Sequence, residues 1–459
     1  MEITSANQEK MGFFCRVSCW FKALWEKIVS KIVEVGRDTK SLGKEDPRRI
    51  IHSVKVGLAI ALVSLGYYFD PIYEGFGVSA MWAVITVVVV FDFSVGGTIG
   101  RAMNRGIATL IGGFLGVGVH RLATCFDIKA LIPIIIALSI FIIAAIGTFA
   151  RFFPKSKARY DYGLLIFILT FCLICVSGYR DDEVLDIALT RLSTIFVGGG
   201  ATVLVCVLVF PVWAGQDLHN LVADNIERIG SFLEGFGEEY FKVMEDENAK
   251  DKKALLNEHK PVLTSKNIED ALINSAKWEP RHGKFRFRHP WGQYQKIGSQ
   301  TRELGYRLDA LKGYLNAEMQ SNPEIRANFE ESCKKMSYES SHALKKLAAG
   351  IRTMTLKSST KAHIADAKAA ANELKSLLKT NPWQHHDLLE VIPVASVASL
   401  LVETVCCTIK IAEAVHELAS LAKFKAEDDA TKPDEQEVTK SFMRTPSIEA
   451  SHGLQVMVE

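Results

Sequence analysis

The sequence predicts an all-α membrane protein in which six transmembrane helices precede a cytoplasmic helical bundle. Apolar residues crowd into residues 50–213 of the 459-residue chain, whereas residues 214–425 are more polar but keep helical periodicity. A spanning helix needs about 20 mostly apolar residues, because the hydrocarbon core of a bilayer is about 30 Å thick. The stretches that meet this requirement are 50–69, 77–93, 105–123, 130–150, 161–178 and 187–213.

The distribution of Lys and Arg predicts that both termini are cytoplasmic. Cations are abundant before the first stretch and in residues 151–160, between the fourth and fifth stretches. They are sparse in loops 70–76 and 179–186, where acidic residues dominate. Because cations that flank a span resist translocation, the cation-rich segments are expected on the cytoplasmic side.

Residues 1–49 are predicted to form a cytoplasmic segment, without a cleavable signal peptide. Apolar residues recur at helical spacing over 11–34, with lysines between them, which is typical of an amphipathic helix. Such a helix either lies on the inner face of the membrane or packs on the cytoplasmic domain, and the sequence leaves both open.

A faint internal repeat links the two halves of the membrane region. Glycines follow Arg105 after seven residues, and glycines follow Arg191 after seven residues. Gly77 and Gly163, which open the second and fifth stretches, each precede one of these arginines by 28 residues. If three spans form each half, the second half runs inverted relative to the first, as in many transport proteins. The sequence therefore predicts an inverted three-helix repeat.

Arg105 and Arg191 are the first candidates for a pore. An arginine within a span is costly and usually faces water or a partner group, so two related arginines predict two levels of positive charge along an anion path. Under this interpretation Arg105 lies at the cytoplasmic end of its span and Arg191 near the external end of its own. The alternative is that each side chain reaches the interface or forms a structural pair, such as Arg191 with Asp186.

Two further cations extend the candidate pore. Lys55 lies five residues into the first stretch, where it either lines the path or reaches the inner interface with its long stem. Arg101 precedes Arg105 by four residues on the same expected helix face, so it would widen an inner vestibule.

The polar part of the chain is predicted to be a helical domain over 214–425, followed by a disordered acidic tail over 426–459. Residues 278–294 interrupt the helical pattern with two prolines and two glycines, and they concentrate aromatic and basic side chains. This segment is either a regulatory site for an anion or partner, or a loop that ties helices together.

The sequence excludes several classes of function. It contains no catalytic triad, metal-ligand cluster or nucleotide-binding motif, so the chain is not expected to be an enzyme and neither a cofactor nor a metal is predicted. The formal net charge is only +2, which predicts no nucleic-acid partner.

Three sets of motifs resemble the plant aluminium-activated malate transporter family. The first is EDPRRIIHSVKVGLA at 45–59. The second is MWAVITVVVVFDFSVGGTIGRAMNRGIATL at 81–110 with RYDYGLLIFILTF at 159–171. The third is FPVWAGQDLH at 210–219 with WEPRHGKFRFRHPW at 278–291 and HELAS at 416–420.

This resemblance implies a channel for malate and other organic or inorganic anions, assembled in the lipid bilayer as a homodimer with its path near the two-fold axis. It also implies that Lys55, Arg105 and Arg191 match basic pore positions of the family. The plasma membrane is favoured as the location, and the vacuolar membrane is the alternative.

Two regulatory features are candidates, and only the first follows from the resemblance, because members of the family differ in their activation by aluminium. One is a 4-aminobutyrate-sensitive stretch, for which the alternative is an interfacial Trp anchor that closes the sixth span. Its residues are Phe210, Pro211, Val212, Trp213, Ala214, Gly215, Gln216, Asp217, Leu218 and His219. The other is a set of external carboxylates that would bind a hard trivalent cation through oxygen, or would simply be solvated. These are Asp70, Glu74, Asp181, Asp182, Glu183 and Asp186.

Passive anion conduction is the leading hypothesis for function. A proton-coupled exporter of acidic aromatic compounds is the alternative, because bacterial efflux proteins have a similar layout. Such an exporter needs an acidic relay within the membrane, for which the only candidate is Asp92, near the inner end of the second stretch. A membrane scaffold that uses its helical domain to bind partners is a third possibility.

Overall fold

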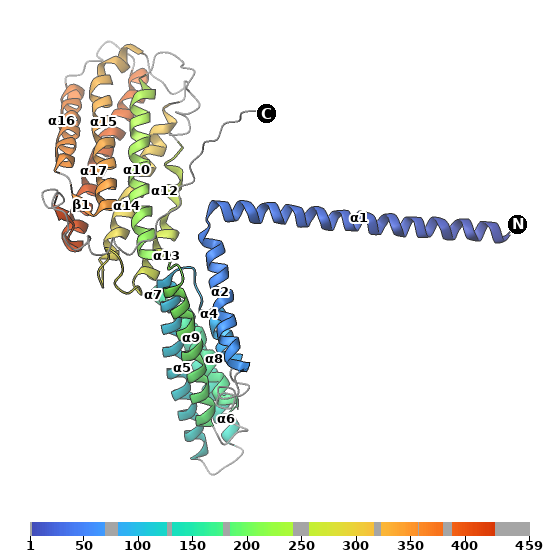
Figure 1. The fold of residues 1–459 in the computed structure, drawn as a ribbon. Helices are drawn as coiled ribbons and strands as arrows, with labels where there is room; N and C mark the ends of the chain where they lie inside the picture. The colour runs from blue at the N-terminus through green and yellow to red at the C-terminus, as the bar shows by residue number, and fades with distance from the viewer. Residues whose placement is uncertain are drawn as a thin grey trace, which may run out of the picture. The chain divides into compact units, whose positions relative to one another are not determined.

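The computed structural model describes residues 2–68, 81–125, 131–177, 184–241, 257–315, 323–356, 358–379 and 388–426 (Figure 1). The elements before the polar part are α1 (Glu2–Glu45), α2 (Arg48–Leu65), η1 (Gly66–Tyr68), α4 (Met81–Val90), α5 (Val95–Thr124), α6 (Ile132–Ala150), α7 (Pro154–Arg159), α8 (Asp161–Ser177) and α9 (Val184–Leu208). Those that follow are α10 (Ala214–Tyr240), α12 (Lys260–Thr264), α13 (Lys266–Ala276), α14 (Trp291–Gly313), α15 (Pro323–Thr353), β1 (Thr355–Leu356), α16 (Ser359–Lys379), α17 (Leu388–Ala422) and β2 (Lys425–Ala426).

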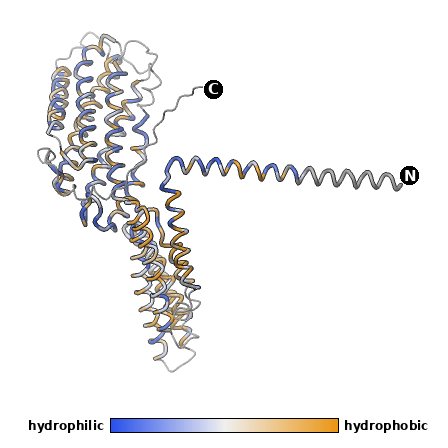
Figure 2. Tube along the Cα trace, viewed as in Figure 1, coloured by the Kyte–Doolittle hydropathy of each residue, from blue (hydrophilic) through white to orange (hydrophobic). Residues whose placement is uncertain are grey.

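Helices long and apolar enough to cross a membrane confirm the all-α membrane class. In the described residues there are five, at Arg48–Gly66, Val95–Thr124, Ile132–Ala150, Leu185–Leu208 and Glu390–Ala422. The first four coincide with expected stretches, and Figure 2 shows hydrophobic residues concentrated along α2 to α9.

The remaining expected stretches, 77–93 and 161–178, coincide with shorter apolar helices. These are α4, with 10 residues, and α8, with 17 residues. Residues 69–80 and 178–183, which adjoin them in the chain, lie outside the described part. The number of spans and the inverted repeat therefore stay predictions.

The fifth long apolar helix, α17, belongs to the part that the sequence assigns to the cytoplasmic bundle. It packs against α14 and α15, and Val394, Val397 and Leu401 are buried on it. Packing against neighbouring helices in the core of a helical bundle therefore accounts for the apolar residues of α17.

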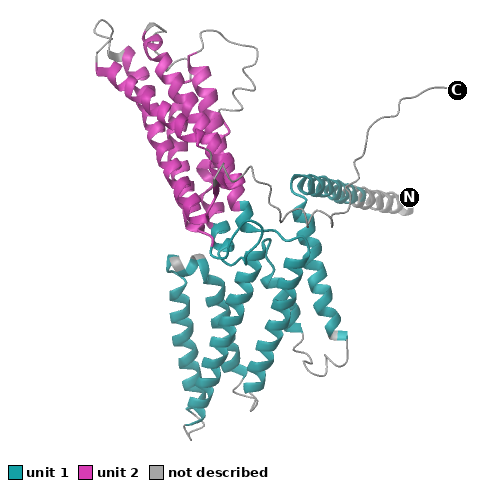
Figure 3. Ribbon diagram, turned by 60° about the vertical axis from the view of Figure 1, so that its left-hand side comes forward, with its two compact units in different colours: residues 1–217, 271–288 teal, residues 218–270, 289–459 magenta. Residues whose placement is uncertain are grey.

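The chain divides into two compact units (Figure 3). Unit 1 comprises residues 1–217 and 271–288, and unit 2 comprises residues 218–270 and 289–459. Residues 271–288, which include the start of the segment that interrupts the helical pattern, thus group with the membrane helices rather than with the rest of 214–425.

Unit 1 is held together by close approach of its long helices. Helix α5 packs along α8 and α9, and α4 packs along α9. A Cβ at Gly112 of α5 would lie 2.9 Å from the carbonyl oxygen of Phe167 on α8, so glycine permits this approach. Large apolar side chains such as Phe114 and Phe141 are 77% and 72% exposed, as expected for side chains that face lipid or a second subunit.

Helix α1 covers the expected amphipathic segment and extends well beyond it in both directions. Its apolar side chains include Trp25 and Ile32, which are 67% and 64% exposed. The two predicted environments for this helix, the membrane surface and the helical domain, both stay open.

Unit 2 is a helical bundle built mainly from α10 and α14 to α17. Stacked aromatic rings of Phe232, Phe236 and Tyr240 fill the inner face of α10, and all three are fully buried. One feature was not expected from the sequence: β1 and β2 pair as two short parallel strands.

Candidate functional site

The position of Arg105 along its helix follows from where α5 begins. Ser94 caps the helix by accepting a hydrogen bond from the Gly97 N–H at 3.1 Å. The helix thus starts at Val95, ten residues before the expected span, and Arg105 lies about 15 Å along it at 1.5 Å per residue. Arg105 therefore lies ten residues into α5 rather than at its start, and its position relative to the membrane stays a prediction.

Arg105 and Arg191 line the same small cavity, which has a volume of about 30 Å³ and which we call the arginine cavity. Its other lining residues are Trp82, Thr109, Ile166, Leu169, Thr170, Leu173, Ile174 and Ile195. The guanidinium carbon of Arg191 lies 3.5 Å from the centre of the Trp82 ring, which is cation–π geometry. The two arginines therefore meet at one cavity instead of forming two separate levels.

Polar atoms in the arginine cavity lack partners. Arg105 is only 6% exposed, and one guanidinium nitrogen donates to the Tyr162 hydroxyl at 3.3 Å. The Nε of Arg105 and the Oγ1 of Thr109 are buried without a hydrogen-bond partner among the described residues. None of the described residues that line this cavity is acidic. Buried polar groups are normally satisfied, so this arrangement has the capacity to bind an anion.

The alternative that Arg191 pairs with Asp186 is not supported within the described part of the chain. Asp186 is exposed, and no ion pair joins it to Arg191. Asp186 is also the only one of the six external carboxylates that the structure describes, because Asp70, Glu74, Asp181, Asp182 and Glu183 lie outside the described residues. The cation-sensing hypothesis is thus untested.

A second polar cavity of unit 1, which we call the inner cavity, has a volume of about 280 Å³. It lies on the side that charge distribution predicts to be cytoplasmic. Its lining residues are Asp92, Gly97, Gly100, Arg101, Asn104, Lys157, Arg159, Asp161, Tyr162, Asn274, Ser275 and Trp278. Arg101 thus lines a polar cavity, together with residues that the sequence analysis did not single out, and its role in an inner vestibule stays a prediction.

The inner cavity contains paired and unpaired charges. Arg101 forms an ion pair with Asp92 at 2.9 Å, and Arg151 forms one with Asp161 at 2.7 Å. Asp92, the candidate relay acid of a proton-coupled exporter, is therefore already paired with an arginine. Lys157 and Arg159 have no carboxylate partner within 4 Å among the described residues.

Lys55 takes a different position from the two arginines. It is fully buried, and its Nζ donates to the carbonyl oxygen of Phe210 at 3.1 Å. Lys55 does not line the arginine cavity. The acceptor residue adopts a positive φ of 42°, which turns the chain just after α9.

The stretch 210–219 is anchored at several points. The Trp213 ring stacks on His282 with centroids 3.9 Å apart, and Asp217 accepts a hydrogen bond from Arg48 at 2.9 Å. Phe210 is 71% exposed, whereas His219 is buried in unit 2 and bonds to Tyr294. Pro211 lies in the turn between α9 and α10.

Glu279 holds the start of α10. Its carboxylate accepts hydrogen bonds from the backbone N–H groups of Ala214 and Gly215 at 2.6 and 3.0 Å. Burial raises the pKa of Glu279, although bonds from these groups and from Gly96 oppose that shift. Gly96 lies in the first turn of α5, so one carboxylate serves the N-terminal ends of two helices.

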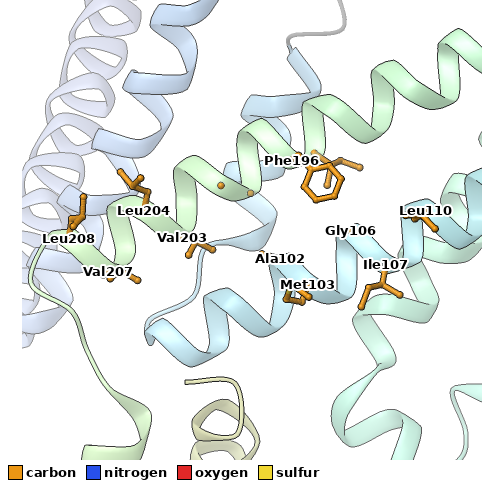
Figure 4. Close-up of a pocket in the computed structure, with 13 residues that line it drawn as sticks. Ala102, Met103, Gly106, Ile107, Leu110, Phe196, Val203, Leu204, Val207 and Leu208 are labelled. Carbon is orange, nitrogen blue, oxygen red and sulfur yellow. The ribbon is translucent and has the colours of Figure 1, made fainter. Parts of the chain in front are cut away.

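A third cavity, about 620 Å³ in volume, lies between α5 and α9 and is apolar (Figure 4). Met103, Ile107, Phe196 and Leu204 are among the side chains that line it. Its described lining residues carry no charge, so it offers no site for an anion.

Comparison with known proteins gives consistent matches. The family model described as Aluminium activated malate transporter matches residues 40–385. "Aluminum-activated malate transporter 2" of Arabidopsis thaliana is 46% identical over 432 residues, which are 94% of this chain and 86% of that protein. "Aluminum-activated malate transporter 1" of Triticum aestivum is 44% identical over 439 residues, which are 92% of this chain and 93% of that protein.

Proposed function

We propose that this chain, which belongs to the Aluminium activated malate transporter family, is a channel that passes malate and other anions across a plant membrane. The chain is a multi-pass membrane protein and not an enzyme, and its relatives are named as malate transporters. The observation that carries the proposal is the arginine cavity, where two guanidinium groups meet without a carboxylate among the described lining residues.

The physical argument rests on what an anion loses when it enters a membrane. Guanidinium N–H groups replace part of the water that a carboxylate leaves behind. A cavity of about 30 Å³ admits roughly one water-sized group, so an anion passes with little of its hydration shell. The charge of the anion also offsets the repulsion between Arg105 and Arg191.

Passive conduction fits the described residues better than proton coupling does. A proton relay needs a carboxyl group that is free to titrate within the membrane. Asp92 instead pairs with Arg101 at the inner cavity.

The proposal also includes the number of spans, the oligomeric state and the membrane in which the protein lies. We propose six spans with both termini in the cytoplasm, and a homodimer as the resemblance implies. The exposed apolar face that includes Phe114 is available to lipid or to a second copy of the chain. The plasma membrane is the favoured location, and the vacuolar membrane is the alternative.

The test is the malate current of Arg105→Ala and Arg191→Ala at matched surface expression. Loss of one charged hydrogen-bond donor should lower the current by about tenfold. Arg121→Ala removes an exposed cation in the last turn of α5 and serves as the control, with a current close to that of the wild type. Unchanged conductance and selectivity in both cavity variants would remove the pore assignment.

A further inference from the structure

The charge balance of the inner cavity points to a dianion. Three cations and two carboxylates line the cavity, but both carboxylates are already paired with arginines. Asp161 is satisfied by Arg151, which does not line the cavity, while Asp92 is satisfied by Arg101. Lys157 and Arg159 form no ion pair within 4 Å with a carboxylate of the described residues, although the charge of Lys157 acts on Asp161 from farther away.

Arg159 is held in place by neutral groups. Asn104 donates to its backbone carbonyl at 3.0 Å, and its guanidinium carbon lies 5.0 Å from the centre of the Trp278 ring. A guanidinium stacked on an aromatic face keeps the N–H groups at its edge available for a carboxylate. A Cβ at Gly100 would lie 2.8 Å from the Trp278 ring, so glycine at this position leaves the indole room.

The two free cations are placed to meet two separate groups. Lys157 and Arg159 are two residues apart on α7, and residues at this spacing do not share a helix face. Both residues nevertheless line the inner cavity, so they provide two separate positive charges there. Two separated cations suit a molecule with a carboxylate at each end better than they suit a halide.

Size separates the roles of the two cavities. The inner cavity, at about 280 Å³, has room for a whole small dicarboxylate, whereas the arginine cavity, at about 30 Å³, does not. Tyr162 connects them, because it lines the inner cavity and its hydroxyl accepts a hydrogen bond from Arg105. This contact places the inner cavity next to Arg105.

We propose that the inner cavity is a docking site for one small dicarboxylate, in which Lys157 and Arg159 each bind one carboxylate before one of these carboxylates reaches the guanidinium groups of the arginine cavity. The proposal rests on the anion-channel function and adds a site that selects dicarboxylates over monovalent anions. Trp278 is a positioning residue there, because it acts through Arg159.

The experiment measures malate and chloride currents of the full-length channel in excised patches, with the anion varied on each side in turn. From the side of the inner cavity, Lys157→Gln and Arg159→Gln should each raise the half-saturating malate concentration about tenfold. The chloride value should change by less than about twofold, because a monovalent anion does not need both cations. Arg121→Gln is the charge-matched control, and its malate value should equal that of the wild type.

A binding measurement separates this proposal from the pore assignment. Malate should raise the Tm of the purified full-length protein. This shift should persist in the double variant Arg105→Gln, Arg191→Gln, which removes the two positive charges of the arginine cavity. The shift should be clearly smaller in Lys157→Gln with Arg159→Gln than in the wild type. The same measurement on Lys157→Gln alone and on Arg159→Gln alone tests the site even if the double variant fails to fold.

The outcomes are distinct. A malate shift that persists unchanged in the Lys157 and Arg159 variants overturns the docking site and leaves the pore assignment intact. Equal changes in the malate and chloride values overturn the selectivity for dicarboxylates. Unchanged currents in the Arg105 and Arg191 variants, with the malate shift clearly smaller in the Lys157 and Arg159 variants, would instead refute the pore assignment alone.

Discussion

The arginine cavity and the inner cavity use positive charge in different ways. In the arginine cavity two arginines meet among apolar walls and two threonines, with no carboxylate among the described lining residues. In the inner cavity two ion pairs surround the free cations Lys157 and Arg159. In the narrow arginine cavity both cations are therefore available to an anion. In the wider inner cavity the ion pairs hold the lining residues in place, and only the cations outside these pairs are available to a ligand.

The largest expected effect comes from reversing charge in the arginine cavity. Arg191→Glu places a carboxylate beside the path, and repulsion of an entering anion should lower both malate and chloride currents about 100-fold or more. Whole-cell recordings at matched surface expression measure this. A variant that still carries anion current of wild-type size would show that the path lies elsewhere.

The second effect concerns the shape of the inner cavity. Gly100→Ala forces a methyl group against Trp278, and overpacking of this kind should raise the half-saturating malate concentration about tenfold. Gly106→Ala is the matched control on the same helix, because a Cβ there has no neighbour within 4 Å. Both changes carry the same gain in helix propensity, so an equal response of the two variants would contradict the role of Trp278.

A smaller effect is expected at the connection between the cavities. Tyr162→Phe removes the hydroxyl that accepts a hydrogen bond from Arg105, and it keeps the ring. Arg105 then loses one restraint but keeps its charge, so the malate current should change by about two- to fivefold, and the selectivity between malate and chloride should stay the same. A change in the selectivity between malate and chloride with no change in the malate current would contradict this role of the Tyr162 hydroxyl.

The smallest effect lies outside both cavities, at Glu279. Its folded-state pKa is raised above the ordinary value of 4.5 by burial, so the folded protein holds this proton where the unfolded chain releases it. That contribution to stability is complete below the unfolded pKa and is lost as the pH rises through the folded value. The Tm of the wild type minus the Tm of Glu279→Gln should therefore fall as the pH rises above 4.5. If this Tm difference instead rises with pH above 4.5, the pKa of Glu279 is not raised in the folded protein.

Hydropathy predicted the membrane class but not that α5 begins ten residues before Arg105. The residues from Val95 to Asn104 are rich in glycine and polar groups, so the apolar window excluded them, although the Ser94 cap starts the helix there. Length and polarity along the chain do not reveal a helix that continues through polar sequence.

The candidate site was predicted in part. The sequence singled out Arg105, Arg191 and Arg101, because a cation in an apolar stretch stands out. It did not single out Arg159, Tyr162 and Trp278 as a group, since Trp278 lies more than a hundred residues further along the chain. Only tertiary structure brings Trp278 against Arg159, and only it separates Lys55 from the two arginines.

A structure of the full-length protein determined in malate tests the central claim most directly. The account predicts anion density within hydrogen-bond distance of the guanidinium groups of both Arg105 and Arg191. An arginine cavity that stays empty at saturating malate, with either side chain turned to lipid or bound to a carboxylate of the protein, would contradict it.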